Sequence, residues 1–135
     1  MTDLETRLTA ARPFIAKPFN RAQDVLLTGN MASYRWGIQN GDIRSIKIGE
    51  RVEITMHNLS MMTHPMHLHG HHFQVVGIDG KPIQGAVRDT VAVPPLASVT
   101  IAFDAANPGI WAFHCHHLYH MVSGMMTFVA YEGVT

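Results

Sequence analysis

The sequence predicts an all-β domain built as an antiparallel β-sandwich or barrel. Three observations predict this fold class: short segments in which apolar and polar residues alternate, glycine and proline turns that separate these segments, and few stretches of helical periodicity. About seven to nine short strands are expected from this spacing. A parallel α/β sheet is the alternative, and the sequence lacks the helices that would have to connect its strands.

The N-terminal residues are expected to form an arm or linker. Leu4, Leu8 and Ala11 recur at helical spacing, and two prolines follow them. A short helix followed by an extended arm is therefore the prediction for residues 1–23, and the domain itself is predicted to span residues 24–135.

Turn residues bound the first strands of the domain. A strand over residues 25–28 is predicted to end at Gly29-Asn30, and further turns are predicted at Asn40-Gly41 and at Ile48-Gly49-Glu50. Apolar and polar side chains alternate in residues 51–56, so this segment is predicted to be a strand with one face in the core.

The second half of the domain repeats the same order of strand and turn. Turns rich in glycine, proline and asparagine close most of its strands. The predicted strands, with their closing turns, are residues 72–78 (Asp79-Gly80), 87–93 (Pro94-Pro95), 99–103 (Asn107-Pro108-Gly109), 110–115 and 125–131.

Composition and charge exclude several functional classes. Ten basic and ten acidic side chains leave no net charge, which argues against nucleic-acid binding through a basic patch. No apolar run approaches the roughly 18 residues of a membrane span. The first twenty residues lack the apolar core and the cleavage site of a signal peptide. A single cysteine excludes an internal disulfide framework.

Histidine and methionine are unusually frequent. Ten histidines and nine methionines in 135 residues indicate metal chemistry, and the soft thioether of methionine favours copper. Most of the histidines lie in two clusters, residues 64–72 and 114–120, and Met125 follows the second cluster.

Strand geometry divides these clusters between two faces. Neighbouring side chains of a strand point to opposite sides. On a strand, His114 and His116 would therefore project one way and Cys115 the other, so one tripeptide can serve two metal sites. By the same argument His67 and His69 form a pair on one face.

On the Cys115 side, a mononuclear blue-copper site can be assembled. Such a site uses a thiolate, two imidazoles and a weak axial thioether. Cys115, His120 and Met125 lie within eleven residues, so one loop can supply three ligands, and His64 is the natural candidate for the second imidazole.

The opposite face offers four imidazoles, from His67, His69, His114 and His116. Four histidines without carboxylates favour copper, zinc, iron or nickel and argue against magnesium or calcium. A structural zinc site is a competing interpretation, but it needs only four ligands and explains neither the methionine nor the surplus of histidines.

Several of these residues have simpler interpretations. A lone cysteine in an apolar strand is usually a small core residue, and His57 is expected to be a strand histidine that faces solvent. The remaining methionines near the clusters are expected to be core or surface residues rather than ligands, and they are Met61, Met62, Met121 and Met126.

From about Asp24 to Tyr131 the chain resembles the C-terminal cupredoxin domain of a multicopper oxidase of the laccase, copper-resistance or bilirubin-oxidase type. The two histidine clusters carry the resemblance, together with other segments that match. These segments are Asn40-Gly41, Gly49-Glu50-Arg51-Val52, residues 88–95 and residues 107–111. The resemblance implies a Greek-key, cupredoxin-like fold.

The resemblance also implies a role for each ligand. A type 1 copper would be bound by His64, Cys115 and His120, with Met125 axial, because the family's Gly-Met step matches Gly124-Met125 rather than Met126. The trinuclear cluster would take His67 at its type 2 copper and His69, His114 and His116 at its type 3 pair. Axial methionine implies a low or middling potential.

The implied reaction is oxidation of a reducing substrate coupled to reduction of dioxygen to water. Electrons would pass from Cys115 through the backbone to His114 and His116, which makes these three the catalytic residues. The substrate classes implied are phenols, aromatic amines and metal ions such as cuprous ion, for which Met61, Met62 and Met66 near His64 are suggestive.

Other residues near the ligands receive lesser roles. His71, His72 and His117 fall outside the ligand pattern, and His71 and His72 are expected to support the ligands or the strand. Asp89 is either an acceptor that orients a ligand histidine or a simple acid at a strand end.

A complete trinuclear cluster in this family has eight histidines, and this chain supplies four. The other four would come from a second cupredoxin domain, which leaves three arrangements: a longer oxidase of which this is one domain, a different subunit, or two copies of this chain facing each other. The alternatives to an oxidase are a stand-alone type 1 copper module for electron transfer or copper storage, and a structural metal-binding domain. The family resemblance implies a periplasmic or secreted protein, whereas the missing signal peptide leaves a clipped N-terminus or a cytoplasmic protein as possibilities.

Overall fold

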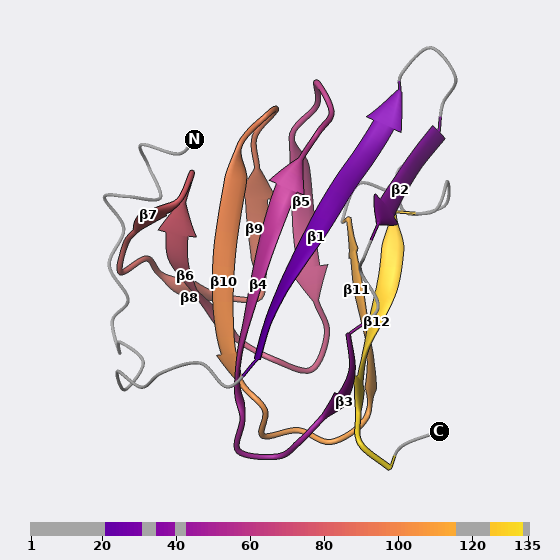
Figure 1. The fold of residues 1–135 in the computed structure, drawn as a ribbon, viewed down its shortest axis with the longest axis vertical. Helices are drawn as coiled ribbons and strands as arrows, with labels where there is room; N and C mark the ends of the chain where they lie inside the picture. The colour runs from indigo at the N-terminus through magenta and orange to yellow at the C-terminus, as the bar shows by residue number, and fades with distance from the viewer. Residues whose placement is uncertain (1–20, 31–34, 40–42, 116–124, 134–135) are drawn as a thin grey trace.

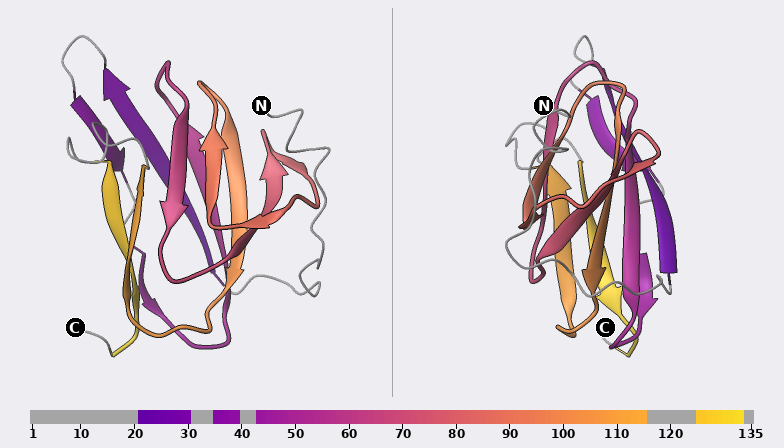
Figure 2. Two further views of the ribbon diagram at one scale, coloured as in Figure 1. Left: turned by 180° about the vertical axis from the view of Figure 1, so that it is seen from behind. Right: turned by 90° about the vertical axis from the view of Figure 1, so that its left-hand side faces the viewer.

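The computed structural model describes residues 21–30, 35–39, 43–115 and 125–133. In these residues the chain forms two β-sheets that face each other as the layers of a sandwich (Figure 1; Figure 2, right). The predicted all-β sandwich is therefore confirmed. The expected helix in the N-terminal arm and the expected turn at Asn40-Gly41 lie outside the described residues.

The first sheet has seven strands. Its order is β2-β1-β4-β10-β6-β7, and β8 also pairs with β6. The strands of this sheet are β1 (Arg21–Asn30), β2 (Arg35–Gln39), β4 (Arg51–Asn58), β6 (Phe73–Ile78), β7 (Lys81–Pro82), β8 (Val87–Arg88) and β10 (Ser98–Asp104).

The second sheet has five strands and contains His64 and His67 of the first histidine cluster and His114 of the second. Its order is β3-β12-β11-β5-β9. The strands of this sheet are β3 (Ile43–Ile46), β5 (His64–Leu68), β9 (Thr90–Val93), β11 (Ile110–Cys115) and β12 (Met126–Tyr131).

Most neighbouring strands are antiparallel, as expected, but each sheet contains one parallel pair. β1 runs parallel to β4 in the first sheet, and β12 runs parallel to β3 in the second. Both sheets are therefore mixed, while the fold class remains the predicted one.

Side-chain alternation fills the space between the sheets. On β4, Val52, Ile54 and Met56 are fully buried, as the alternation of that segment predicts. Arg51 at the start of β4 is also buried, and its guanidinium donates to Asp104 at the end of β10 (Nε–Oδ1, 2.6 Å). This ion pair joins the ends of two neighbouring strands at the edge of the core.

One predicted strand is wrong in a way that matters for the site. Residues 87–93 form two strands rather than one: β8 pairs with β6 in the first sheet, and β9 pairs with β5 in the second. The chain crosses between the sheets at Asp89, which belongs to neither strand. The sequence of residues 87–93 does not reveal this crossing, because the residues before Asp89 and those after it are both compatible with a strand.

The described residues contain twelve strands, more than the seven to nine expected. Short strands such as β7 and β8, with two residues each, account for much of the difference. β1 begins at Arg21 and pairs with β4 from its first residue, so regular structure starts before Asp24. No helix that is long and apolar enough to cross a membrane occurs in the part of the chain that the structure describes.

Candidate metal centre

β5 and β11, which carry His64, His67, His114 and Cys115 of the predicted ligands, are neighbouring antiparallel strands. His114 lies opposite His67, and Cys115 lies opposite Met66. The two clusters are therefore adjacent in space, although they are about fifty residues apart in the sequence. Because side chains alternate along both strands, one face of this pair points to the core and the other points outward.

The core face brings together Cys115 and His64. Both side chains are fully buried, and the Cys115 Sγ lies 3.8 Å from the Nδ1 of His64. Met125 is fully buried as well, and its carbonyl accepts a hydrogen bond from the Cys115 N–H (3.0 Å). Three of the four predicted ligands of the mononuclear site therefore lie buried around β5, β11 and the start of β12.

The other nitrogen of His64 contacts a residue that the sequence did not single out. The Nε2 of His64 lies 2.7 Å from the Oγ of Ser60, which is also buried. The ring is thus held between a hydroxyl on one side and the thiol on the other.

The outward face brings together His67, His69 and His114. Their ring centroids are 4.6 Å (His67–His69), 5.0 Å (His69–His114) and 5.6 Å (His67–His114) apart. The Nε2 atoms of His69 and His114 are 2.9 Å apart. Two imidazole nitrogens at that distance share one proton in the metal-free protein, which a metal would displace on binding.

Backbone carbonyls orient two of these rings. The Nδ1 of His67 donates to the carbonyl of Asp89 (2.9 Å), and the Nδ1 of His114 donates to the carbonyl of Cys115 (2.9 Å). A carbonyl only accepts, so each Nδ1 carries the proton and each Nε2 is the nitrogen with the lone pair. This is how metal-binding histidines are commonly secured.

Asp89 accepts a hydrogen bond from His67, as the first prediction for Asp89 has it, but through a different atom than a carboxylate role would use. Its backbone carbonyl, rather than its carboxylate, accepts the hydrogen bond from His67, and its Oδ1 stays 3.8 Å away from the His67 Nδ1. The carboxylate instead accepts from the Thr90 hydroxyl (3.1 Å), whose oxygen lies 3.0 Å from the same His67 nitrogen. The crossing between the sheets at Asp89 is what places this carbonyl beside His67.

His71 supports the outward cluster from below the surface. It is buried, its Nδ1 donates to the carbonyl of His69 (3.1 Å), and its Nε2 accepts from the Tyr131 hydroxyl (2.6 Å). Burial lowers the pKa of His71 below its ordinary 6.5 and raises the pKa of Tyr131 above its ordinary 10.0. His72 is exposed. The expectation that His71 supports a ligand fits this contact.

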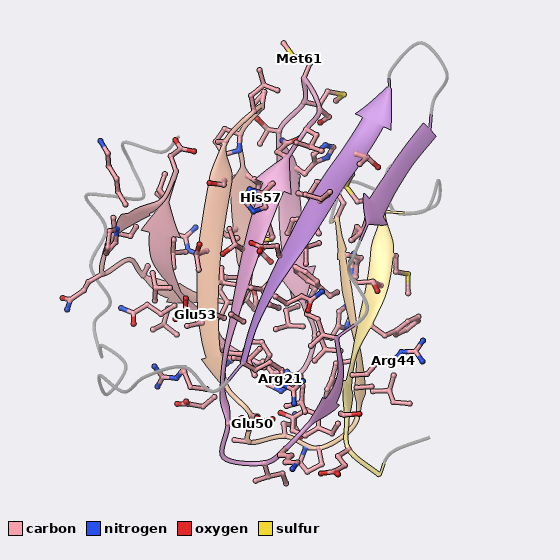
Figure 3. The ribbon with its side chains drawn as sticks, viewed as in Figure 1. Arg21, Arg44, Glu50, Glu53, His57 and Met61 are labelled. Atoms are coloured by element: carbon pink, nitrogen blue, oxygen red, sulfur yellow. The ribbon has the colours of Figure 1, made fainter. Side chains whose placement is uncertain are left out.

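The methionines fall into a buried and an exposed group, and His57 lies on the outer face of its strand. Met125 and Met66 are fully buried, whereas Met126 is 40% exposed and Met61 is 74% exposed. Figure 3 shows Met61 at one end of the sandwich and His57 on β4, where His57 faces outward beside Asp24 (3.1 Å) as predicted.

Part of the predicted ligand set lies outside the described residues. That part comprises His116 and His120; His117, Met121 and Gly124, which were not predicted to be ligands, also lie outside the described residues. Within the described ranges, no three His, Cys, Asp or Glu side chains converge closely enough to hold one ion by themselves.

An apolar strip continues from the outward histidines along β11 and β12. Met126 lies opposite His114 and is 40% exposed, and beyond it Phe128 (48%) and Ile110 (46%) are also exposed. Exposed large apolar side chains that adjoin one another are typical of a surface that another protein or domain covers.

Comparison with known proteins places this geometry in a family. Residues 12–133 match the family described as multicopper oxidase. The chain is 44% identical over 113 residues to the multicopper oxidase MmcO of Mycobacterium tuberculosis, an alignment that covers 79% of this chain and 22% of that protein. It is 37% identical over 138 residues to a copper resistance protein A homolog of Pseudomonas syringae pv. tomato, covering 98% of this chain and 23% of that one.

Solved structures agree on the fold. The crystal structure of a multi-copper oxidase from Pediococcus acidilactici superposes with a TM-score of 0.77 at 23% identity, covering 93% of this chain and 29% of that one. The cupredoxin-like fold is thereby confirmed. The chain spans about a fifth of the length of the curated relatives described above.

Proposed function

The chain belongs to the multicopper oxidase family, and on that premise we propose that it forms the type 1 copper site and half of the trinuclear copper site of an oxidase. The observation that supports this most is that two consecutive residues of β11 have different neighbours. Cys115 lies beside the buried imidazole of His64, and His114 lies beside His69 on the outward face. A single strand thereby serves two sites.

The buried side fits a type 1 copper by the chemistry of its donors. His64, Cys115 and Met125 are all fully buried, and a thiolate, imidazoles and a thioether are the donors of a blue-copper site. We assign His64, Cys115, His120 and axial Met125 to this ion. The burial of Met125 and the exposure of Met126 support Met125 as the axial residue.

The outward side fits the larger copper site. His67 and His114 each keep Nδ1 on a backbone carbonyl, which leaves Nε2 as the donor atom. We assign His67 to the type 2 copper and His69, His114 and His116 to the type 3 pair. When bound, copper at these sites supplies the one-electron oxidation of a reducing substrate and the four-electron reduction of dioxygen to water.

This chain's residues have distinct parts in that activity. Cys115 and His114 are consecutive, so a few covalent bonds of the backbone join the buried site to the outward one. The Cys115 carbonyl also accepts the hydrogen bond from the His114 Nδ1, which ties the two residues a second time. His116 would supply the second such connection.

The partner in this proposal is a second cupredoxin domain that brings four more histidines. The apolar strip of Ile110, Met126 and Phe128 adjoins the outward histidines and would be buried by that domain. The domain belongs to a longer chain, to another subunit or to a second copy of this chain. The reducing substrate is a phenol, an aromatic amine or a metal ion, and the family resemblance favours the periplasm or the cell exterior.

Copper content, native mass and visible absorption together test the proposal. The copper-loaded protein is expected to show an intense thiolate-to-copper band, with more than one copper per chain in any assembly that completes the outward site. Cys115→Ser is expected to abolish the band, whereas His57→Gln, which changes a histidine that faces outward beside Asp24, is expected to keep it.

Two results distinguish the alternatives. A blue monomer with one copper per chain and no oxygen consumption would support the stand-alone electron-transfer module instead. Retention of the visible band in Cys115→Ser would overturn the assignment of the thiolate.

A further inference from the structure

A buried polar network lies at the end of β4, next to His64. It consists of Asn58 and Ser60, which are 1% and 2% exposed, and of the fully buried His64. Polar side chains are costly to bury unless their hydrogen bonds are made. Each contact in this network therefore needs one donor and one acceptor.

The amide of Asn58 has only one orientation that satisfies its surroundings. One end lies within hydrogen-bond distance of three backbone carbonyls, those of Met62 (2.7 Å), Val93 (2.9 Å) and Pro94 (3.0 Å). Carbonyls only accept, so this end is the NH₂ group, and the other end is Oδ1. The backbone N–H of Ser60 donates to that oxygen (2.9 Å), which agrees with the assignment.

The direction of the Ser60 hydroxyl follows from the orientation of Asn58. The Ser60 Oγ lies 2.7 Å from Asn58 Oδ1 and 2.7 Å from His64 Nε2. A hydroxyl has one proton. Oδ1 has none, so the contact with Asn58 is a hydrogen bond only if Ser60 donates to it. The hydroxyl then accepts from His64, and Nε2 must carry the proton.

From this chain of contacts we infer that Asn58 and Ser60 are positioning residues that fix the tautomer of His64, with the proton on Nε2 and the lone pair of Nδ1 directed at Cys115. Nδ1 is the nitrogen 3.8 Å from the Cys115 sulfur. The role assigned to that nitrogen in binding copper rests on the proposed function, whereas the tautomer itself does not.

The network also explains how the metal ligand is tied to both sheets. Asn58 is the last residue of β4 in the first sheet, and it donates to Val93 at the end of β9 in the second. The loop that carries Ser60 therefore closes around a side chain anchored to both layers. A ligand held this way is oriented before metal arrives, which removes part of the ordering that binding would otherwise require.

The first test uses the metal-free protein and needs no copper chemistry. Nitrogen-15 NMR of the reduced chain near neutral pH reports which ring nitrogen of His64 bears the proton. The expected result is a single tautomer with Nε2 protonated. A His64 protonated on Nδ1, or an equal mixture of tautomers, would overturn the inference.

The second test compares variants that differ in one hydroxyl. Ser60→Ala removes the acceptor, Ser60→Thr retains a hydroxyl, and Ser98→Ala makes the same deletion at the start of β10, opposite His57 on the face of the sheet that points away from the network. Copper affinity is measured by competition with a chelator of known affinity. Loss of a hydrogen bond to a ligand histidine lowers metal affinity by about 10- to 100-fold, so we expect that loss in Ser60→Ala and less than a threefold change in Ser98→Ala.

The outcomes separate this inference from the proposed function. An unchanged affinity in Ser60→Ala, with the thiolate band of the wild type present, would overturn the role of Ser60 while leaving the copper site intact. Absence of a thiolate band in the wild type would overturn the proposed function, and the NMR tautomer would still decide the arrangement of His64. Recovery of affinity in Ser60→Thr would support the hydroxyl as the acting group.

Discussion

Met125 and Met126 are consecutive residues with opposite environments, so they offer a matched pair of perturbations. Met125 is fully buried and Met126 is 40% exposed. Complete burial of a methionine side chain is worth about 1.5–3 kcal/mol in transfer from water, and the cavity left by truncation adds to it. We expect Met125→Ala to lower the free energy of unfolding by about 2–5 kcal/mol, and Met126→Ala to change it by less than about 0.5 kcal/mol.

Urea unfolding of the metal-free, reduced protein measures both variants. A shift of the midpoint with an unchanged slope reports stability alone, because the slope follows the surface exposed on unfolding. Equal costs for the two alanine variants, or a larger cost for Met126→Ala, would refute the difference in packing that separates the two side chains.

The leucine variants then test the thioether apart from its packing. Met125→Leu nearly conserves volume and should cost less than about 1.5 kcal/mol. In the copper-loaded protein this substitution would remove the axial ligand that we propose, so we expect a higher reduction potential in Met125→Leu and no change in Met126→Leu. A change confined to Met126→Leu would show that the axial assignment belongs to the other residue.

Two further predictions concern positions outside the ligands. Gly70 has φ +75°, and an added Cβ would come within 2.5–2.7 Å of the Trp111 ring. Gly49 also has a positive φ, +91°, but an added Cβ there would meet no atom within 4 Å. In urea unfolding, Gly70→Ala should therefore destabilise the protein by clearly more than Gly49→Ala. The pKa of Glu50 is lowered, chiefly because the backbone N–H of Lys47 donates to its carboxylate (2.6 Å), so its stabilising contribution is present above its ordinary pKa of 4.5 and is lost as the pH falls through the folded value. The gap in Tm between wild type and Glu50→Gln should accordingly close as the pH is lowered, and a gap independent of pH would contradict the shift.

The sequence was sufficient to predict the fold class and the division of His114 and Cys115 between two faces, because both depend on a period of two. On β11, alternation alone predicts that His114 and Cys115 point to opposite sides, and the structure places them beside different partners. The same rule predicts the pairing of His67 with His69. Such predictions succeed where a strand is straight and both of its faces are constrained by neighbours.

The rest depends on contacts between segments far apart in the sequence. Nothing in residues 87–93 marks the crossing at Asp89, yet that crossing puts a carbonyl beside the Nδ1 of His67. Asn58 and Ser60 were missed as well, since an asparagine at a strand end followed by a serine is an ordinary turn signal. The available signal was their spacing of six and four residues before His64, which acquires meaning only once the loop is known to fold back.

The two faces of the β5–β11 pair differ in how much of each site this chain can preform. On the core face, His64 is held by Ser60, Cys115 is enclosed between the sheets, and Met125 is buried beside them. On the outward face, the hydrogen bonds to Asp89 and Cys115 orient His67 and His114, but the surface around them continues into exposed apolar side chains. The described part of the proposed thiolate site is therefore preorganised by this fold, whereas the proposed outward site would be completed by the domain that we propose covers β11 and β12. It follows that loss of the covering partner should weaken copper binding at the outward histidines and leave the thiolate site bound.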